Sequence, residues 1–163
     1  MKKFLSVFVF LAIAACGPSP SQIASQAALD TAIAEGKPLF ITSFYSLRPN
    51  SAGGVDVAME FVNLSGKTIK YLRHRATPYN AVGDVQRGTV RRRTTFGLND
   101  TGPYAPMERS SGSWENVWYN STISCVVINR VEIEYMDGTR RIFGSPSEVQ
   151  SIMAPGLRNS CRV

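Results

Sequence analysis

Histidine and cysteine, the side chains from which many catalytic and metal sites are built, are scarce in this sequence. There is one histidine, His74, and there are three cysteines among 163 residues. This set does not assemble a zinc site of familiar ligand spacing. Neither a Gly-x-Ser-x-Gly frame for a catalytic serine nor a glycine-rich phosphate loop is present. We therefore expect no catalytic residue, no metal and no cofactor.

His74 itself does not have the neighbours of a catalytic base. It lies between Arg73 and Arg75 in a segment that we expect to be a strand. Two nearby guanidinium groups disfavour protonation of an imidazole, so they do not hold it poised near neutral pH. We expect a solvent-facing or cross-strand-paired histidine.

The apolar run at the N-terminus is too short to cross a membrane. It covers residues 4–15, is interrupted only by Ser6, and follows Lys2 and Lys3. A transmembrane helix needs roughly 20 apolar residues, so this run is typical of a signal-peptide core. Gly17 and Pro18 follow and do not continue a helix.

The end of this run, Ile13-Ala14-Ala15-Cys16, resembles the lipobox of bacterial lipoproteins. The resemblance implies that residues 1–15 are a cleaved signal peptide and that Cys16 becomes the lipid-modified first residue of the mature chain. Two or three acyl chains hold a protein on a membrane without a span, since each buried methylene contributes about 0.8 kcal/mol. Because Gly17 stands where an aspartate tends to mark inner-membrane retention, we expect a cell-envelope protein on the outer membrane, facing the periplasm. An ordinary secretory peptide with a chance cysteine is the alternative.

The charge balance is mildly basic and does not indicate nucleic acid as a partner. The formal net charge is +6 for the whole chain, and it falls to +4 once Lys2 and Lys3 leave with the signal peptide. An excess of this size is compatible with anionic lipid or sugar surfaces. The residues that remain are enough for one domain.

Two cysteines, Cys125 and Cys161, remain if Cys16 carries lipid. An even number of cysteines in an exported protein predicts a disulfide bond. Closing a loop of about 36 residues would stabilise the fold by roughly 3–4 kcal/mol in the chain-entropy model. Two free cysteines are the alternative.

Periodicity predicts a mainly β domain between two short helices. Residues 16–37 are expected to be a lipid-anchored tether with a helix over 21–35, and residues 146–163 a helix over 147–153 with a tail. The domain between them, residues 38–145, alternates apolar and polar side chains most clearly at Val55, Val57, Met59 and Phe61. Strands are expected at 39–45, 55–61, 68–77, 85–96, 113–119, 123–135 and 140–143, and a loop at 99–106. Short strands with regular turns predict an antiparallel β-sandwich of about seven strands.

Five segments of this domain resemble an uncharacterised immunoglobulin-like domain of secreted bacterial proteins. They are residues 57–63, 67–71, 78–84, 112–120 and 132–139, and the likeness extends over residues 39–143. It implies an immunoglobulin-like fold. Because no activity is assigned to that family, it implies no catalytic residue.

Two groups of side chains are candidate binding sites. The first is a basic strip on the expected third and fourth strands, where Arg91 and Arg93 would share one face and Arg92 the other. It could bind lipid phosphates, lipopolysaccharide or an acidic partner; an edge strand protected by charge is the alternative. Its members are Arg73, Arg75, Arg87, Arg91, Arg92 and Arg93.

The second group is aromatic and consists of Trp114, Trp118 and Tyr119. In a regular strand the two tryptophans point to one face. Core packing is the usual role of tryptophan in a sandwich, whereas an exposed pair would indicate a surface for sugar stacking or protein contact.

These observations favour a non-catalytic envelope lipoprotein that binds another envelope component, a protein or a glycan. A surface-displayed adhesin or host-interaction factor is the second hypothesis. An enzyme with an unrecognised site is the third.

Overall fold

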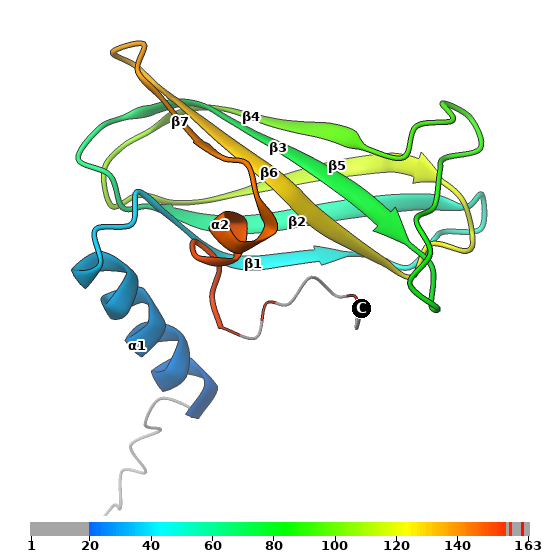
Figure 1. Ribbon diagram of the computed structural model, residues 1–163, viewed down its shortest axis with the longest axis horizontal. Helices are drawn as coiled ribbons and strands as arrows, with labels where there is room; N and C mark the ends of the chain where they lie inside the picture. The colour runs from blue at the N-terminus through cyan, green and yellow to red at the C-terminus, as the bar shows by residue number, and fades with distance from the viewer. Residues whose placement is uncertain (1–19, 156, 158–160, 162–163) are drawn as a thin grey trace, which may run out of the picture.

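The computed structural model describes residues 20–155, 157 and 161, so the expected signal peptide and Cys16 lie outside the described residues. Seven antiparallel strands form two sheets, with a short helix before and after them (Figure 1). The elements are α1 (Pro20–Ala34), β1 (Leu39–Ser46), β2 (Gly54–Asn63), β3 (Ile69–Tyr79), β4 (Phe96–Tyr104), β5 (Arg109–Tyr119), β6 (Cys125–Tyr135), β7 (Arg140–Phe143) and α2 (Pro146–Gln150).

The sheets have the strand orders β1-β2-β5 and β4-β3-β6-β7, and they do not close into a barrel. β4 pairs with β3 and not with β5, so the second sheet has four strands and the first has three. The prediction of an antiparallel β-sandwich of about seven strands is confirmed.

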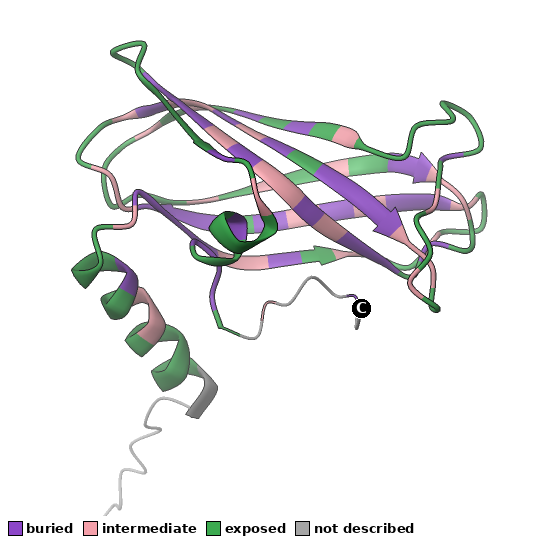
Figure 2. Cartoon of the chain, in the orientation of Figure 1, coloured by how far each residue is buried: buried purple, intermediate pink, exposed green. Residues whose placement is uncertain are grey.

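The core lies between the two sheets, and alternation along the strands supplies it. On β2, Val55, Val57, Met59 and Phe61 are buried, whereas Asp56, Ala58 and Glu60 are more exposed. β4 alternates in a similar way, whereas β1 and β6 also contain runs of buried residues; Figure 2 colours these positions by burial. Burying one such side chain stabilises the fold by about 1.5–3 kcal/mol.

The C-terminal segment covers the free edge of β1. α2 begins with a capping box between Ser145 and Glu148. Beyond α2, the Ile41 N–H donates to the carbonyl of Ile152, and the Ala154 N–H donates to the carbonyl of Ile41. These bonds occupy edge groups that would otherwise be open to another strand.

The helix expected at 21–35 is confirmed as α1, and it packs weakly. Ala32 is buried against Phe40 and Ala154, and Leu29 is partly buried beside them. Ile23 remains 56% exposed. α1 therefore contacts the sandwich near its C-terminal end and projects away from it (Figure 1).

The fourth strand was predicted in the wrong place. Residues 85–95 form turns and irregular structure, with one isolated bridge from Val85 to Tyr79. The expected loop at 99–106 is instead largely strand β4, in which Leu98 and Asp100 point inward and are buried. Pairing with β3 outweighs the turn-forming composition of the segment, and Pro103 is tolerated because β4 is an edge strand.

The sandwich has two ends with different loops (Figure 1). We call the end at which α1 joins β1 the proximal end; it also carries the loops at 64–68, 105–108 and 136–139. The opposite end, the distal end, carries the loops at 47–53, 80–95 and 120–124.

Candidate functional site

The structure separates the six arginines of the predicted basic strip. Arg73 lies on the outer face of the four-stranded sheet, where its Nη1 is 2.9 Å from Glu134 Oε2 and 3.3 Å from Glu132 Oε1. The hydrogen bond from Arg73 is the main reason why the pKa of Glu134 lies below its ordinary value. Arg73 is therefore part of a cross-strand ion-pair network and does not contribute to a free basic surface.

Arg75 is also apart from the other arginines, because β3 pairs with residues 96–104 and not with residues 85–96. It is exposed on β3 opposite Gly97 of β4 and Arg130 of β6. The prediction that Arg91, Arg92 and Arg93 alternate along a strand is wrong for the same reason. All three lie in the loop at 80–95, and Arg92 adopts a left-handed conformation with φ 49°.

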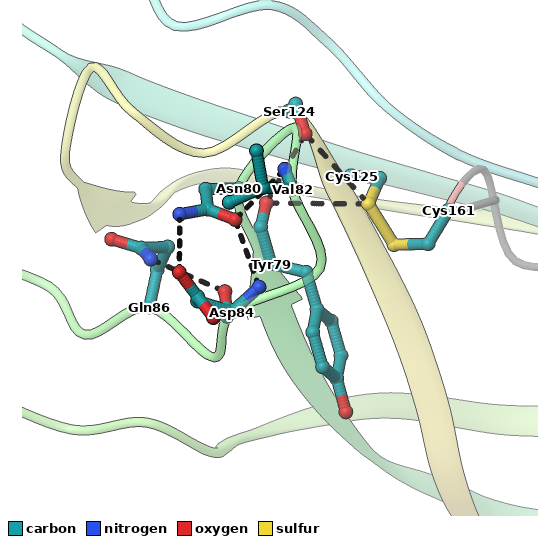
Figure 3. Close-up of a disulfide and its surroundings, with 8 residues drawn as sticks. All are labelled: Tyr79, Asn80, Val82, Asp84, Gln86, Ser124, Cys125 and Cys161. Carbon is teal, nitrogen blue, oxygen red and sulfur yellow. Dashed lines mark hydrogen bonds between the residues drawn. A yellow bond between two sulfur atoms is a disulfide. The ribbon is translucent and has the colours of Figure 1, made fainter. Parts of the chain in front are cut away.

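The first part of this loop is a compact turn beside the disulfide bond (Figure 3). Asn80 Oδ1 accepts the N–H groups of Val82 and Asp84 at 3.1 and 2.8 Å, a use of asparagine typical of turns. The Ser124 N–H donates to the carbonyl of Tyr79 at 2.9 Å. Next to it, Cys125 and Cys161 form the predicted disulfide bond, with their Cα atoms 5.2 Å apart.

The second part of the loop is fastened to the end of β5 and the loop that follows it. Thr89 donates from both its N–H and its Oγ1 to the carbonyl of Tyr119, at 2.8 and 2.7 Å. Asn120 Nδ2 donates to the carbonyl of Arg87 at 2.9 Å, and Thr122 Oγ1 donates to Gln86 at 2.9 Å. The arginine-bearing turn is therefore held against β5 by bonds to main chain and side chain.

A pocket of about 300 Å³ lies between this turn and β5; we call it the distal pocket. Its lining comes from Gly88, Val90, Arg91 and Arg93 in the loop, from Phe96 and from residues 115–119. The structure thus brings two members of the predicted basic strip together with two members of the predicted aromatic group, Trp118 and Tyr119. The exposed residues Arg87 and Arg92 are not among the lining residues.

The distal pocket has unpaired positive charge. No carboxylate within the described part of the chain lies within ion-pair distance of Arg91 or Arg93. The Arg91 guanidinium lies 5.6 Å from the ring centre of Phe96, a cation–π contact. Glu115 is the one carboxylate of the lining. Two cations and one anion in a small pocket favour an anionic ligand.

The inner wall of the distal pocket is aromatic. Trp118 is 2% exposed and packs edge-on against Phe96, with ring centres 6.1 Å apart. Its Nε1 is buried without a hydrogen-bond partner, and such an unpaired group is costly. A Cβ at Gly88 would lie 3.5 Å from Trp118 Cδ1, the carbon bonded to Nε1. The Cδ1 atom of the indole therefore faces Gly88, one of the residues that line the pocket.

Trp114 contacts a different part of the core from Trp118. The strand between them is irregular, since Trp114 and Trp118 pair with Val57 and Val55 across a register shift, and Asn116 has a left-handed φ of 49°. Trp114 is partly buried and donates from Nε1 to the carbonyl of Asn99 at 3.3 Å. The core role expected for the tryptophans is confirmed, since Trp118 is buried in the core and Trp114 packs against it. The expectation of a regular strand, from which we predicted that both point to one face, is wrong.

His74 is 1% exposed, so of the two expected roles the solvent-facing one is wrong, and the cross-strand pairing is confirmed by its contact with Asp100 on β4. Its Nε2 lies 3.6 Å from Asp100 Oδ2, and its ring packs edge-on against Trp114. A side chain at Gly112 would occupy the position of the Asp100 carboxylate. Sequence parity could have indicated this burial, because His74 shares its face of β3 with the buried residues Leu72 and Ala76.

Burial controls the protonation of this pair. It lowers the pKa of His74 to about 3 and raises the pKa of Asp100 to about 6. Protonation of His74 is therefore suppressed by desolvation, and not by the flanking arginines. Neither imidazole nitrogen has a hydrogen-bond partner. The pair belongs to the core and is not part of the distal pocket.

No group of three His, Cys, Asp or Glu side chains among the described residues could hold a metal ion. None of the helices that the structure describes is long and apolar enough to cross a membrane.

Comparisons with protein-family models, with curated proteins and with solved structures found no match to the chain.

Proposed function

We propose that this chain is a lipid-anchored bacterial envelope protein, a non-catalytic module that binds another envelope component at the distal end of its sandwich. The lipobox-like segment that ends in Cys16 supports the anchor. The observation that carries the binding role is the distal pocket, where Arg91 and Arg93 converge without a carboxylate partner.

The path of the chain supports a binding site at the end of the sandwich that lies away from the lipid anchor. A lipid on Cys16 would connect through residues 17–19 to α1, whose 15 residues extend about 22 Å at 1.5 Å per residue. α1 enters the sandwich at the proximal end (Figure 1). The distal pocket lies at the other end, where a partner could reach it without passing the anchor.

The chemistry of the distal pocket supports binding more than catalysis. Its lining contains no serine, cysteine, histidine or lysine, and Glu115 is its one carboxylate. General acid–base or nucleophilic catalysis normally needs a pair of such groups within hydrogen-bond reach. Burial keeps His74 neutral in the core.

The anchor is tested by feeding expressing cells an alkyne analogue of palmitate. Since Cys125 and Cys161 form a disulfide bond, Cys16 is the remaining cysteine. We expect label on the wild-type chain and none on Cys16→Ala. Equal labelling of both chains, or none on the wild type, would contradict the anchor.

The binding role is tested by crosslinking in intact cells followed by mass spectrometry of the captured partner. We expect an envelope component that is captured by the wild type and lost with Cys16→Ala. Capture of abundant neighbours alone would contradict the proposal. Digestion of the domain by protease added to intact cells would instead support the surface-displayed adhesin.

A further inference from the structure

We propose that the distal pocket binds an acidic saccharide, a sugar that carries a carboxylate or a phosphate. This inference rests on the proposed function, because it takes the distal end as the contact surface. It specifies the class of ligand, which the proposed function leaves open.

The positive charge of the pocket is available to a ligand. Arg91 and Arg93 both line it, and no carboxylate in the described ranges pairs with either. The turn that bears them is closed by a bond from the Arg92 N–H to the Gly88 carbonyl at 2.9 Å and is fastened to Tyr119 through Thr89. A guanidinium binds a carboxylate or phosphate through paired, charge-assisted hydrogen bonds. A fixed turn lowers the ordering cost of forming them.

Glu115 distinguishes a sugar from an acidic peptide. Its carboxylate lines the same pocket as the two arginines and can only accept hydrogen bonds when ionised. An acidic sugar offers its anionic group to the arginines and its hydroxyl hydrogens to Glu115. A run of acidic side chains would place like charges beside Glu115, which is unfavourable in a partly enclosed site.

The remaining walls fit a small ring. Phe96 and Tyr119 are partly buried and supply apolar surface, and the buried indole of Trp118 closes the inner side. A volume of about 300 Å³ is at the small end of ligand sites. The site is therefore suited to one sugar unit and not to a long apolar chain.

The two tryptophans provide the measurement. The chain has two indole N–H groups. Trp118 lines the pocket and its N–H is buried without an acceptor, whereas the N–H of Trp114 is bonded to Asn99. The purified, isotope-labelled protein, kept in mild detergent, is titrated at constant ionic strength and followed by the two indole signals in NMR. The probes are glucuronate, a glucose monophosphate, glucose, inorganic phosphate and a short polyglutamate peptide.

We expect a saturable shift of the Trp118 signal with glucuronate or the glucose monophosphate, and a much smaller response of Trp114. Glucose should give no shift. Arg91→Gln and Arg93→Gln should each weaken binding by about tenfold or more, as expected for the loss of a charged hydrogen bond. Arg92→Gln is the matched control, since it removes the same charge from the same turn but not from the lining; it should bind as the wild type does.

Several results would overturn the inference. They are the absence of any Trp118 shift, equal responses to glucose and glucuronate, equal responses to inorganic phosphate and the sugar phosphate, or unchanged binding by both arginine variants. Tighter binding of polyglutamate than of any sugar would indicate that the ligand is an acidic protein and not a saccharide.

Failure here can be told apart from failure of the proposed function. Crosslinking in cells with an Arg91→Gln/Arg93→Gln chain separates the two. If the double variant still captures the partner, the proposal of a binding module stands and the proposal that the pocket binds an acidic saccharide is wrong.

Discussion

The two ends of the sandwich contain similar cations and use them differently. At the proximal end, Lys37 is 3.3 Å from Glu35, Lys67 is 2.7 Å from Asp137, and Arg140 is 3.0 Å from Glu134. These three cations line a hollow of about 470 Å³ together with Arg141, which forms no ion pair within the described residues. At the distal end, Arg91 and Arg93 line a smaller pocket and form no ion pair with a carboxylate in the part of the chain described. The comparison indicates that three of the four cations of the proximal hollow complete the fold, whereas both arginines of the distal pocket remain available to a ligand.

Removing the disulfide bond should have the largest effect on stability. The double variant Cys125→Ser/Cys161→Ser frees the C-terminal tail from the distal end (Figure 3). The chain-entropy model predicts a loss of roughly 3–4 kcal/mol for a loop of this length. Denaturant unfolding measures it, and a loss below about 1 kcal/mol would contradict the view that this bond is a main cross-link of the distal end.

Two turn asparagines sharpen the comparison of the ends. At the proximal end, Asn63 is fully buried and its Nδ2 donates to the carbonyls of Lys67, Tyr104 and Ala105 at 2.9–3.0 Å. Asn80 at the distal end makes its turn near solvent. Asn63→Ala should cost about 2–3 kcal/mol because it removes hydrogen bonds to three carbonyls from a buried side chain, and Asn80→Ala about 1 kcal/mol. Equal losses in denaturant unfolding would contradict this difference.

The buried His74–Asp100 pair, between the ends, should give opposing pH dependences. Burial raises the pKa of Asp100 from 3.8 to about 6, so the stability that Asp100 contributes is lost as pH rises through this range. Burial lowers the pKa of His74 from 6.5 to about 3, so the His74 contribution is lost as pH falls below 6.5. In the wild type the two effects largely cancel between pH 3.8 and about 6.

Each single variant removes one of the two effects. As the pH is raised from about 4 to 6, the free energy of unfolding of Asp100→Asn should increase relative to that of the wild type. That of His74→Gln should decrease over the same range. Each change should be up to about 3 kcal/mol. Denaturant unfolding at several pH values measures both curves. Parallel curves for all three proteins would show that the pair is not protonated as described.

The smallest expected effect concerns the unpaired arginines. Because Arg91 and Arg93 have no carboxylate partner, Arg91→Gln and Arg93→Gln should each change stability by less than about 0.5 kcal/mol. Arg73→Gln, which leaves the buried Glu134 without its 2.9 Å donor, should cost clearly more. A loss with Arg91→Gln as large as that with Arg73→Gln would show that Arg91 completes the fold.

Alternation along the chain was enough to predict most strands and the sandwich, and the even number of cysteines left besides Cys16 predicted the disulfide bond. It failed where pairing outweighs local composition. Asn99, Asp100, Gly102 and Pro103 are typical of a loop, but Leu98 and Asp100 are buried once β4 pairs with β3. The consecutive arginines at 91–93 form a turn because Thr89 and Asn120 fasten the loop to residues distant in sequence.

The candidate site could be predicted only in part. The sequence identified Arg91, Arg93, Trp118 and Tyr119 as binding candidates, in two separate groups. Their convergence on one pocket depends on contacts between the loop and β5, which no local pattern reports. The burial of His74 was within reach of the sequence, because its strand parity matches that of its apolar neighbours.

The central claim, that the distal end is the contact surface, is tested most directly by placing one photo-crosslinking amino acid at either end in intact cells. Val82 at the distal end and Met136 at the proximal end are 80% and 60% exposed, so either position can be replaced with little change to the core. We predict that the crosslinker at position 82 captures a discrete partner and that the one at position 136 does not. Capture from position 136 alone would contradict the claim and assign the contact surface to the proximal end.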